Sequence, residues 1–322
     1  MSDIKPKISI ITLTYKDYSN LFKTIKSILD QDCIGFEYII SDDGSGDFPE
    51  KEVRDFIDSN KKENLLNFEL LINKTNVGTV KHLNNVIKRC NGDFIFDLSG
   101  NDYLLNNHVI TYLLEVFDSE KCDVLIVSRV NYKNGKICGI CPHYKEWKKI
   151  NKLDTRLKRY SAMVRYEHFG MFIGPNVFYK REVIEKNGYF DENYVLLEDA
   201  PMICKMFWNN KVSIRPDVFA VVYDSENGVS SRKVKHPLLK EDLHRFNLYG
   251  KTEHYSELDF KTKYHIRFGI KREKAKNKVE FVIICLLYFP RLITYFFYSL
   301  GRKINSLYDK KYIKTNFLDN KT

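Results

Sequence analysis

Four short polar clusters hold most of the side chains in this sequence that are suited to chemistry. Each cluster follows an apolar run rich in β-branched residues, which is the pattern of a buried strand. In chain order the clusters contain Thr12, Thr14 and Tyr15, then Asp42 and Asp43, then Asn73 and Asn76, then Ser99, Gly100, Asn101 and Asp102. Ligands bind at the carboxyl ends of the strands of a parallel α/β sheet, so the four clusters together predict a single binding edge.

The segments that must position these clusters alternate between strand and helix patterns. Strand-like runs cover residues 7–15, 36–41, 67–74, 93–98 and 123–129, and apolar residues at helical spacing cover 21–29, 80–87 and 108–117. This alternation predicts an α/β fold with a mostly parallel, doubly wound, Rossmann-like central sheet flanked by helices. The sequence has no GxGxxG after the first strand and no GxxxxGK[ST], so neither a nicotinamide site nor a P-loop is supported.

Composition limits the classes of partner. The chain has 322 residues, 43% of them hydrophobic, which is enough for one large domain or for one domain with an appendage. Its net charge of +10 suits nucleic acid, anionic lipid or phosphorylated substrates equally well. The basic residues gather beside an apolar tail and in 131–170, which we expect to be irregular and substrate-facing, so nucleic acid is not the expected partner. Scattered cysteines and no recognisable signal peptide favour a cytoplasmic protein.

The tail differs from the rest of the chain. A strongly basic run, 271–278, leads into 22 mostly apolar residues, 279–300, which Pro290 and Arg291 interrupt. A charge at that position is costly in hydrocarbon, so we expect two half-length helices lying in the membrane surface, with lysines on anionic headgroups. A helix pair packed on the main domain or in a homo-oligomer interface, and a single spanning helix, are the alternatives. The expected location is therefore cytoplasmic, peripheral on the inner face of the cell membrane through residues 271–303.

Residues 7 to about 230 resemble the family 2 glycosyltransferases, which have the GT-A fold. The resemblance lies in ISIITLTYKDYSNLFKTIKSILDQ, EYIISDDGSGD, NVGTVKHLNN, NGDFIFDLSGNDYLL and FIGPNVFYKREVIEKNGYFDENYVLLEDAPM, which follow the family's order and spacing. It implies a catalytic domain over 1–235, with a nucleotide-sugar half of about 1–104 and an acceptor half of about 105–235. Residues 236–322 would then form a helical, membrane-associating extension.

The resemblance also implies an activity. The chain would be an inverting glycosyltransferase that moves a sugar from a nucleotide donor, UDP in our expectation, to a hydroxyl of a glycan or of a lipid-linked acceptor. A bacterial surface polysaccharide, such as a capsule or lipopolysaccharide, would be the product. A catalytically silent nucleotide- or sugar-binding module on the same fold is the main alternative, and it predicts that Asp199 is dispensable. A nucleotidyltransferase would carry a Gly-rich, basic phosphate loop after the first strand, and none is present.

The nucleotide-binding residues are assigned by the same resemblance. Thr12, Thr14 and Tyr15 would lie near the base, with Tyr15 packing or stacking on it. Either Asp42 or Asp43 would accept the imide N–H of uracil while the other caps the following turn. Where the family's third loop approaches the nucleotide, this sequence has Asn76 and Gly78, although a helix cap is an equal interpretation of Asn76.

The family's DXD motif falls on Ser99, Gly100 and Asn101, so both of its acidic positions are neutral here. Ser99 could still bond a ribose hydroxyl, and Asp102 would be the firm ligand of Mg²⁺ or Mn²⁺. Metal dependence would consequently be weak. A plain turn is the alternative interpretation of this segment, and Asp97 is expected to be a structural residue of the strand.

On the acceptor side the resemblance points to an acidic pair. Asp199 would be the general base that deprotonates the acceptor hydroxyl, and Glu198 would orient Asp199 or bind the acceptor. Pro175 and Asn176 would shape the acceptor pocket. Residues 230–232 would serve the diphosphate. The sequence names neither the donor sugar nor the acceptor and linkage.

Overall fold

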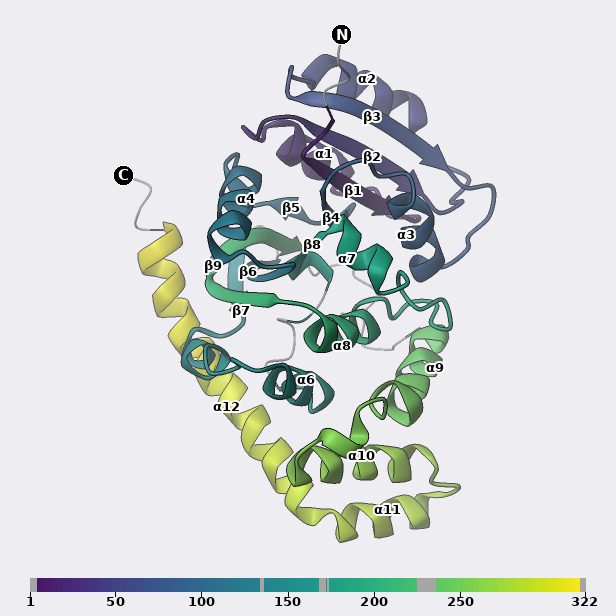
Figure 1. The fold of residues 1–322 in the computed structure, drawn as a ribbon, viewed down its shortest axis with the longest axis vertical. Helices are drawn as coiled ribbons and strands as arrows, with labels where there is room; N and C mark the ends of the chain where they lie inside the picture. The colour runs from purple at the N-terminus through teal and green to yellow at the C-terminus, as the bar shows by residue number, and fades with distance from the viewer. Residues whose placement is uncertain (1–4, 134–135, 168–171, 173, 225–235, 319–322) are drawn as a thin grey trace.

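The computed structural model describes residues 5–133, 136–167, 172, 174–224 and 236–318. Within these residues, nine strands form one sheet in the order β3-β2-β1-β4-β8-β6-β9-β5, with β7 paired to β6 (Figure 1). The strands are β1 (Ile8–Thr14), β2 (Phe36–Asp42), β3 (Leu65–Ile72), β4 (Phe94–Ser99), β5 (Tyr103–Leu104), β6 (Val124–Lys133), β7 (Lys136–Cys141), β8 (Val177–Lys180) and β9 (Val212–Asp224). The predicted α/β class is confirmed.

The helices cover both faces of this sheet. They are α1 (Leu21–Leu29), α2 (Glu50–Asn60), α3 (Thr79–Ile87), α4 (Val109–Glu120), α5 (Trp147–Ile150), α6 (Arg156–Val164), α7 (Arg181–Lys186) and α8 (Asp199–Asn209), followed by α9 (Pro237–Arg245), α10 (Phe260–Glu273), α11 (Lys278–Leu287) and α12 (Phe289–Ile313). Side chains of α1, α2 and α4 share one core layer with Ile10 of β1, whereas α3, α6, α7 and α8 share the other with Ile11. Alternate residues of one strand therefore supply the two cores.

The first half of the sheet follows the predicted pattern. Strand β1 pairs in parallel with β2 and β4, and β2 pairs in parallel with β3, so the carboxyl ends of these strands lie at one edge. In the second half, β8 lies antiparallel between β4 and β6, whereas β9 runs parallel to β6. The second half is therefore mixed, and its antiparallel pairings extend the sheet beyond the parallel strands that the sequence pattern predicts.

Two sequence expectations need correction. Helix α2 has no counterpart in the predicted pattern, because charged residues dominate it and only Val53 and Ile57 are buried. Residues 131–170 are not irregular, since their described part contains the β6–β7 hairpin together with α5 and α6. Strand β7, whose side chains are mostly exposed or half-buried, lacks the clean alternation that marks a strand in sequence.

The C-terminal extension is tied to the sheet by its last helix. Residues 279–300 divide between α11 and α12 at Tyr288, and α12 runs back along the molecule to β7 (Figure 1). There Asp309, which is only 1% exposed, accepts the Tyr144 backbone N–H at 3.0 Å, and its Oδ2 lies 2.5 Å from His143 Nδ1. Within the described part of the chain, no helix combines the length and apolar character needed to cross a bilayer.

The buried Asp309 carboxylate predicts a measurable stabilisation. The Asp309→Ala variant leaves a part-buried backbone N–H and a histidine without this acceptor, so we expect the free energy of unfolding to fall by about 1–3 kcal/mol. Urea unfolding followed by circular dichroism measures this. Asp118→Ala, on the exposed face of α4, serves as the control and should change the value by less than about 0.5 kcal/mol. Equal losses in the two variants would contradict the docking role.

Candidate active site

Asp42 closes the turn after β2. Its Oδ1 accepts hydrogen bonds from Thr14 Oγ1 at 3.1 Å, Tyr18 OH at 3.2 Å and Ser45 Oγ at 2.7 Å, and its Oδ2 accepts the Ser45 N–H at 2.8 Å. The side chain is fully buried. Asp42 therefore links the ends of β1 and β2 through hydrogen bonds. Thr14, one of the predicted nucleotide contacts, donates one of these bonds.

Asp43 holds the loop that leads into α3. Its Oδ1 accepts Asn73 Nδ2 at 2.9 Å and the Val77 N–H at 3.0 Å, and its Oδ2 accepts the Gly78 N–H at 3.0 Å. In both Asp42 and Asp43, Oδ2 accepts a hydrogen bond from only one of the described donors. Each carboxylate can therefore accept one further hydrogen bond. Both aspartates thus have loop-tying roles, and each keeps a lone pair for a further hydrogen bond, although Asp42 is 0% and Asp43 only 3% exposed.

The other predicted nucleotide contacts differ in accessibility. Tyr15 is 44% exposed, and Asn76 is also exposed. Thr12 instead faces the interior, where its hydroxyl lies 2.9 Å from the hydroxyl of buried Tyr38. The N-cap of α3 is Gly78, with no side-chain cap bond, so the helix-cap interpretation of Asn76 is wrong. Tyr15 and Asn76 lie at the surface of this edge and Thr12 supports it from inside.

The segment Ser99-Gly100-Asn101-Asp102 is locked onto the first loop. The Gly100 N–H donates to Leu13 O at 3.1 Å, and a Cβ at Gly100 would lie 2.8 Å from Thr14 Cγ2, so any other residue here requires Thr14 to shift. Thr24 Oγ1 donates to Gly100 O at 3.0 Å and to Asp102 O at 2.7 Å. Helix α1 therefore fixes this turn, and Ser99 is left exposed at its start.

Asp102 is a buried carboxylate beside a second one. It is 3% exposed, and its Oδ1 accepts the Asp224 N–H at 3.1 Å. Burial, helped by the charge of Asp224, raises the pKa of Asp102 to about 7, while the hydrogen bond from the Asp224 N–H and the charge of Arg129 oppose the rise. A carboxyl group in this condition gains from a neighbouring cation.

The oxygen donors around Asp102 fit a divalent cation only in part. Asp102 and Asp224 are hard oxygen ligands of the kind that Mg²⁺ and Mn²⁺ prefer. The described residues, however, contain no group of three or more His, Cys, Asp or Glu side chains that could hold a metal. The site thus suits a cation shared with the phosphates of a bound ligand, because Mg²⁺ is commonly held by one or two carboxylates plus substrate phosphates.

Arg129 is a site residue that the sequence analysis missed. It lies on β6, is 8% exposed, and its guanidinium stands over the Tyr223 ring at 4.4 Å. Its Nε donates to Asn131 Oδ1 at 3.1 Å, whereas Nη1 is buried with no hydrogen-bond partner among the described residues. The positive charge of Arg129 lowers the pKa of Asp102 and also that of Asp199, so it acts on both carboxylates. An arginine in an otherwise apolar strand was the only sequence signal.

A second acidic group lies at the start of α8. Asp199 is the first residue of this helix and Glu198 precedes it. Asp97 Oδ2 and Glu198 Oε1 each lie 3.8 Å from the point where a Cβ of Gly174 would stand. Asp97, expected to be a structural strand residue, therefore lies beside the predicted catalytic pair.

The protonation of this acidic group is shifted strongly. Burial raises the pKa of Asp199 to about 6 and that of Asp97 to about 6, and it raises the pKa of Glu198 well above its ordinary value. The backbone N–H of Ala200 donates to Asp199 Oδ1 at 2.6 Å, which favours the ionised form. Burial therefore favours the neutral form of Glu198, whereas the Ala200 N–H favours the ionised form of Asp199 beside it.

The remaining predictions are placed as follows. Asn176 is fully buried in a short 3₁₀ turn, Gly174–Asn176, and Pro175 is half-buried in the same turn. This turn follows directly after residues that the structure does not describe, and residues 230–232 also lie outside the described residues. The turn does adjoin Asp97 and Glu198 through Gly174, so Pro175 and Asn176 lie close to the acidic group.

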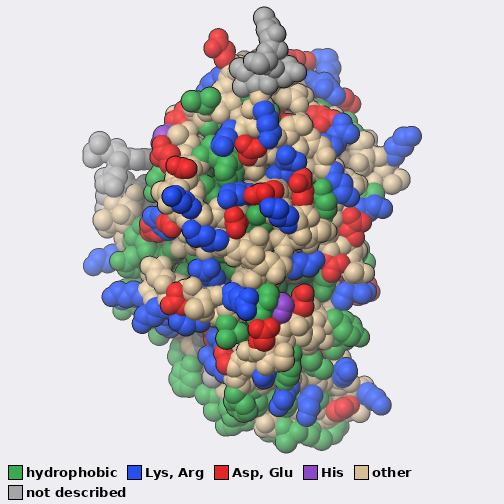
Figure 2. Space-filling view, in the orientation of Figure 1, with side chains coloured by type: hydrophobic (Ala, Val, Ile, Leu, Met, Phe, Trp, Pro, Cys, Tyr) green, Lys and Arg blue, Asp and Glu red, His purple; other side chains and the backbone are tan. Residues whose placement is uncertain are grey.

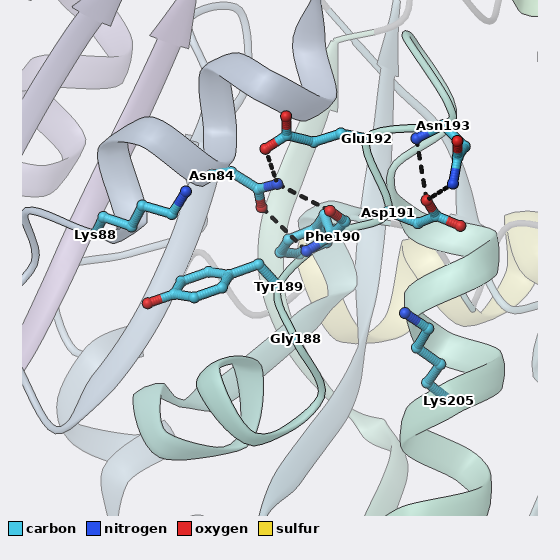
Figure 3. A pocket seen from close by; sticks show the side chains of 9 residues that line it. All are labelled: Asn84, Lys88, Gly188, Tyr189, Phe190, Asp191, Glu192, Asn193 and Lys205. Carbon is cyan, nitrogen blue, oxygen red and sulfur yellow. Dashed lines mark hydrogen bonds between the residues drawn. The ribbon is translucent and has the colours of Figure 1, made fainter.

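A separate groove lies between α3 and the loop before α8 (Figure 3). It has a volume of about 430 Å³ and is lined by polar residues that include Lys88, Asp191 and Lys205. Asn84 holds its floor by donating to Phe190 O at 2.8 Å. None of the residues predicted for the site lines this groove, so it is not where they converge.

Comparison with known proteins shows the family. Residues 9–188 match the family described as Glycosyl transferase family 2. A search of curated protein sequences gave no significant match.

Solved structures show the fold. The crystal structure of S. aureus TarS gives a TM-score of 0.55 at 18% identity and covers 85% of this chain but 50% of that one, so this chain spans about half its length. Its fragment 1–349 in complex with UDP-GlcNAc gives 0.54 at 16% identity, covering 83% and 81%. The mannosyltransferase PcManGT from Pyrobaculum calidifontis, in complex with GDP-Man and Mn²⁺, gives 0.52 at 14% identity, covering 99% and 88%.

The raised pKa of Asp97 predicts a pH-dependent stability. Its folded-state pKa of about 6 lies above that of an exposed aspartate, so ionisation opposes folding and stability is lost as the pH rises through about 6. Asp97→Asn removes this cost and should gain about 1–3 kcal/mol over the wild type at pH 8, with little gain at pH 4. Urea unfolding at both pH values measures the difference.

Asp93→Asn is the matched control for that measurement. The hydrogen bond from Lys5 lowers the pKa of Asp93, so this carboxylate stabilises the fold when ionised and its contribution is lost as the pH falls. The control should therefore lose stability at pH 8, the opposite sign. A pH-independent difference for Asp97→Asn would contradict the account of its burial.

Proposed function

The chain belongs to glycosyl transferase family 2 and is a glycosyltransferase, and from that premise we propose that it transfers a sugar, with inversion, from a UDP-sugar to a hydroxyl of a glycan or lipid-linked acceptor. The observation that carries this proposal is the acidic group at the start of α8, where an Asp199 with a pKa of about 6 adjoins Glu198. A pKa close to the working pH suits a general base. The expected product is a surface polysaccharide of a bacterium.

Asp199 supplies the proton acceptor for the reaction. It takes the proton of the acceptor hydroxyl while that oxygen attacks the anomeric carbon from the face opposite the nucleotide. One bond forms to the acceptor oxygen, the bond to the diphosphate oxygen breaks, and the anomeric centre inverts. In its neutral form, which burial favours, Glu198 donates a hydrogen bond that orients Asp199 or the acceptor. Pro175 and Asn176 shape the neighbouring acceptor pocket.

We assign the leaving diphosphate to the part of the site around Arg129 and Asp102. Arg129 brings a buried positive charge whose Nη1 has no partner among the described residues, and a diphosphate oxygen would satisfy it. Asp102, with Asp224 beside it, would hold Mg²⁺ or Mn²⁺ together with the donor phosphates. A cation held there would supply positive charge against the negative charge that develops on the diphosphate. Ser99 bonds the ribose, and Tyr15 packs on the base.

UDP is the proposed donor nucleotide on two grounds. The carboxylates of Asp42 and Asp43 each retain capacity to accept the imide N–H of uracil, and a fragment of S. aureus TarS with this fold binds UDP-GlcNAc. Asn76, Gly78, Gly100 and Asn101 complete the nucleotide-binding edge. The catalytic domain comprises residues 1–235 and the extension residues 236–322.

A silent binding module is the second candidate. The neutral Ser99 and Asn101, and the absence of a group of three metal-ligating side chains in the described part of the chain, favour it. It shares the nucleotide site but requires no role for Asp199. Activity of the Asp199 variant therefore separates the two.

The extension is proposed to dock the enzyme on an anionic membrane from the cytoplasmic side. Large apolar side chains are exposed along α11 and the first half of α12, and Figure 2 shows hydrophobic side chains gathered over the lower end of the molecule, where Figure 1 has α11. They include Val279, Val282, Ile283, Leu286, Leu287, Phe289, Phe296 and Phe297, each at least half exposed. Basic residues stand on both sides, which matches an apolar face at the level of anionic headgroups.

Removing the base should abolish transfer without removing donor binding. For Asp199→Asn we expect the rate of UDP release from UDP-sugars to fall by about 10²–10⁴, with UDP affinity unchanged within about threefold. Envelope lipid extract supplies the acceptor, and the wild-type rate should fall as the pH drops through about 6, because Asp199 must be ionised. Asp191→Asn, in the groove of Figure 3, is the matched control. Full activity of Asp199→Asn would exclude this mechanism.

Membrane docking is tested with vesicles. The double variant Leu286→Ser, Phe297→Ser should bind vesicles containing phosphatidylglycerol at least about 100-fold more weakly, because each large apolar side chain contributes about 1.5–3 kcal/mol when buried. The control Ile34→Ser, Ile72→Ser removes two exposed apolar side chains elsewhere and should bind as the wild type does. Wild-type protein that forms a dimer through this face and ignores vesicles would contradict membrane docking.

A further inference from the structure

A buried carboxylate of the extension binds the chain just before α8. Asp242 lies on α9 and is 3% exposed. Its Oδ2 accepts hydrogen bonds from three consecutive backbone N–H groups, those of Val195 at 2.9 Å, Leu196 at 2.6 Å and Leu197 at 3.1 Å. Successive N–H groups that converge in this way form a concave anion-binding arrangement of the backbone, and their bonds to a carboxylate are stronger than bonds between neutral groups. The extension therefore holds residues 195–197, which we call the 195–197 segment.

The 195–197 segment runs directly into the acidic pair. Glu198 follows Leu197 in the chain, and Asp199 is the first residue of α8. Burial is the main cause of the raised pKa of Glu198, and the charges of Asp199, Asp97 and Asp242 add to it. Asp242 is therefore close enough to Glu198 to act on it electrostatically, besides holding the backbone that leads to it.

The same segment contacts the predicted nucleotide edge. The Val80 N–H, at the start of α3, donates to Val195 O at 3.1 Å, and a Cβ at Gly78 would lie 2.7 Å from Val195 Cγ1. The Gly78 N–H in turn donates to Asp43 Oδ2 at 3.0 Å. Asp43 therefore fixes the loop on the nucleotide side, whereas Asp242 fixes the segment that packs against this loop.

Side chains of the extension pack around the neighbouring residues. The rings of Phe246 and Tyr194 meet in a T-shaped contact with centroids 6.4 Å apart, and a Cβ at Gly250 would lie 2.8 Å from the Tyr194 hydroxyl. Leu239 of α9 belongs to the same hydrophobic core cluster as Leu197. Helix α9 lies between the sheet and the pair formed by α10 and α11 (Figure 1). The first part of the extension is thus packed into the core beside the acidic pair.

We propose that Asp242 is a positioning residue of the transferase, which sets the place of Glu198 and Asp199 relative to a bound donor by holding the 195–197 segment. It acts through the backbone and not on the substrate. A misplacement of about 1 Å at a reacting group costs about 10²-fold in rate, so a single carboxylate in this position matters for turnover. Helix α9 then belongs to the catalytic unit. This inference rests on the proposed role of Asp199 as the base.

The kinetic test uses the full-length protein, with UDP-glucose, UDP-galactose and UDP-GlcNAc as separate donors and envelope lipid extract as the acceptor. Asp242→Ala should lower kcat by about 10–100-fold, because three N–H groups lose their acceptor and the acidic pair shifts. The KM for the donor and the affinity for UDP should stay within about threefold, since Asp43 still holds the loop on the nucleotide side. Asp242→Asn keeps an accepting oxygen in place, so its kcat should be at least about fivefold above that of Asp242→Ala.

Hydrogen exchange of the amides of the 195–197 segment gives a readout that does not depend on activity. These amides should exchange at least about tenfold faster in Asp242→Ala and keep most of their protection in Asp242→Asn. Glu241→Ala removes an exposed carboxylate from the same helix and is the matched control, with exchange and kcat as in the wild type.

A second variant keeps the proposal testable if Asp242→Ala does not bind UDP and has therefore not folded. Asp242→Glu retains the carboxylate but moves its oxygens by one methylene group. Its kcat should fall by at least about fivefold while its UDP affinity is kept, because the held segment is displaced and not released.

Several results would overturn the proposal. They are wild-type kcat in folded Asp242→Ala or in Asp242→Glu, equal losses of kcat in Asp242→Ala and Asp242→Asn, unchanged amide exchange in Asp242→Ala, or equal losses in the Glu241→Ala control. If the wild type turns over none of the donors, the failure is that of the proposed function. Amide exchange alone then decides whether Asp242 positions the segment before the acidic pair.

Discussion

The active-site half of this molecule is governed by the cost of taking carboxylates out of water. Asp97, Asp102, Glu198 and Asp199 all have pKa values raised by burial, and Arg129 is the cation whose charge acts on both acidic groups. The parallel strands bring the polar chain ends to one edge, and hydrogen bonds from the loops hold them there. A carboxyl group of this site therefore keeps its proton to a higher pH than a surface carboxyl group does, and a neighbouring cation stabilises its ionised form.

The cost of burying charge also applies where the C-terminal extension meets the rest of the molecule, but the buried groups there are basic and not acidic. There Lys251 and His265 are buried among arginines, and the pKa of each is lowered. Helix α12 connects this junction to β7 through Asp309, so the apolar helices and the sheet form one structure. If the exposed apolar face docks on a membrane as proposed, this continuity holds the candidate site in fixed relation to the membrane surface.

Sequence patterns predicted the parts of the fold that have strong periodicity. The parallel strands, α1 and α3 were recognisable because buried strands and amphipathic helices repeat in a simple way. Helix α2, β7 and α5 were not, because few of their residues are buried, and α6 was not, because its buried residues are the consecutive run 160–164 and not a stripe at helical spacing. In the candidate site, the order of motifs points to Asp102 and Asp199, but it gives no sign of Arg129, because only tertiary packing shows that this strand residue lies near their carboxylates.

The measurement that tests the central account most directly is calorimetric binding of UDP, with GDP and CDP as controls, with and without Mn²⁺ or Mg²⁺. It is made on the wild type and on Asp102→Ala. Tight UDP binding that the metal strengthens, and that Asp102→Ala makes insensitive to metal, is the result we predict. Binding that ignores both the metal and Asp102 would contradict the role of Asp102, and no nucleotide binding at all would contradict the nucleotide-sugar donor site.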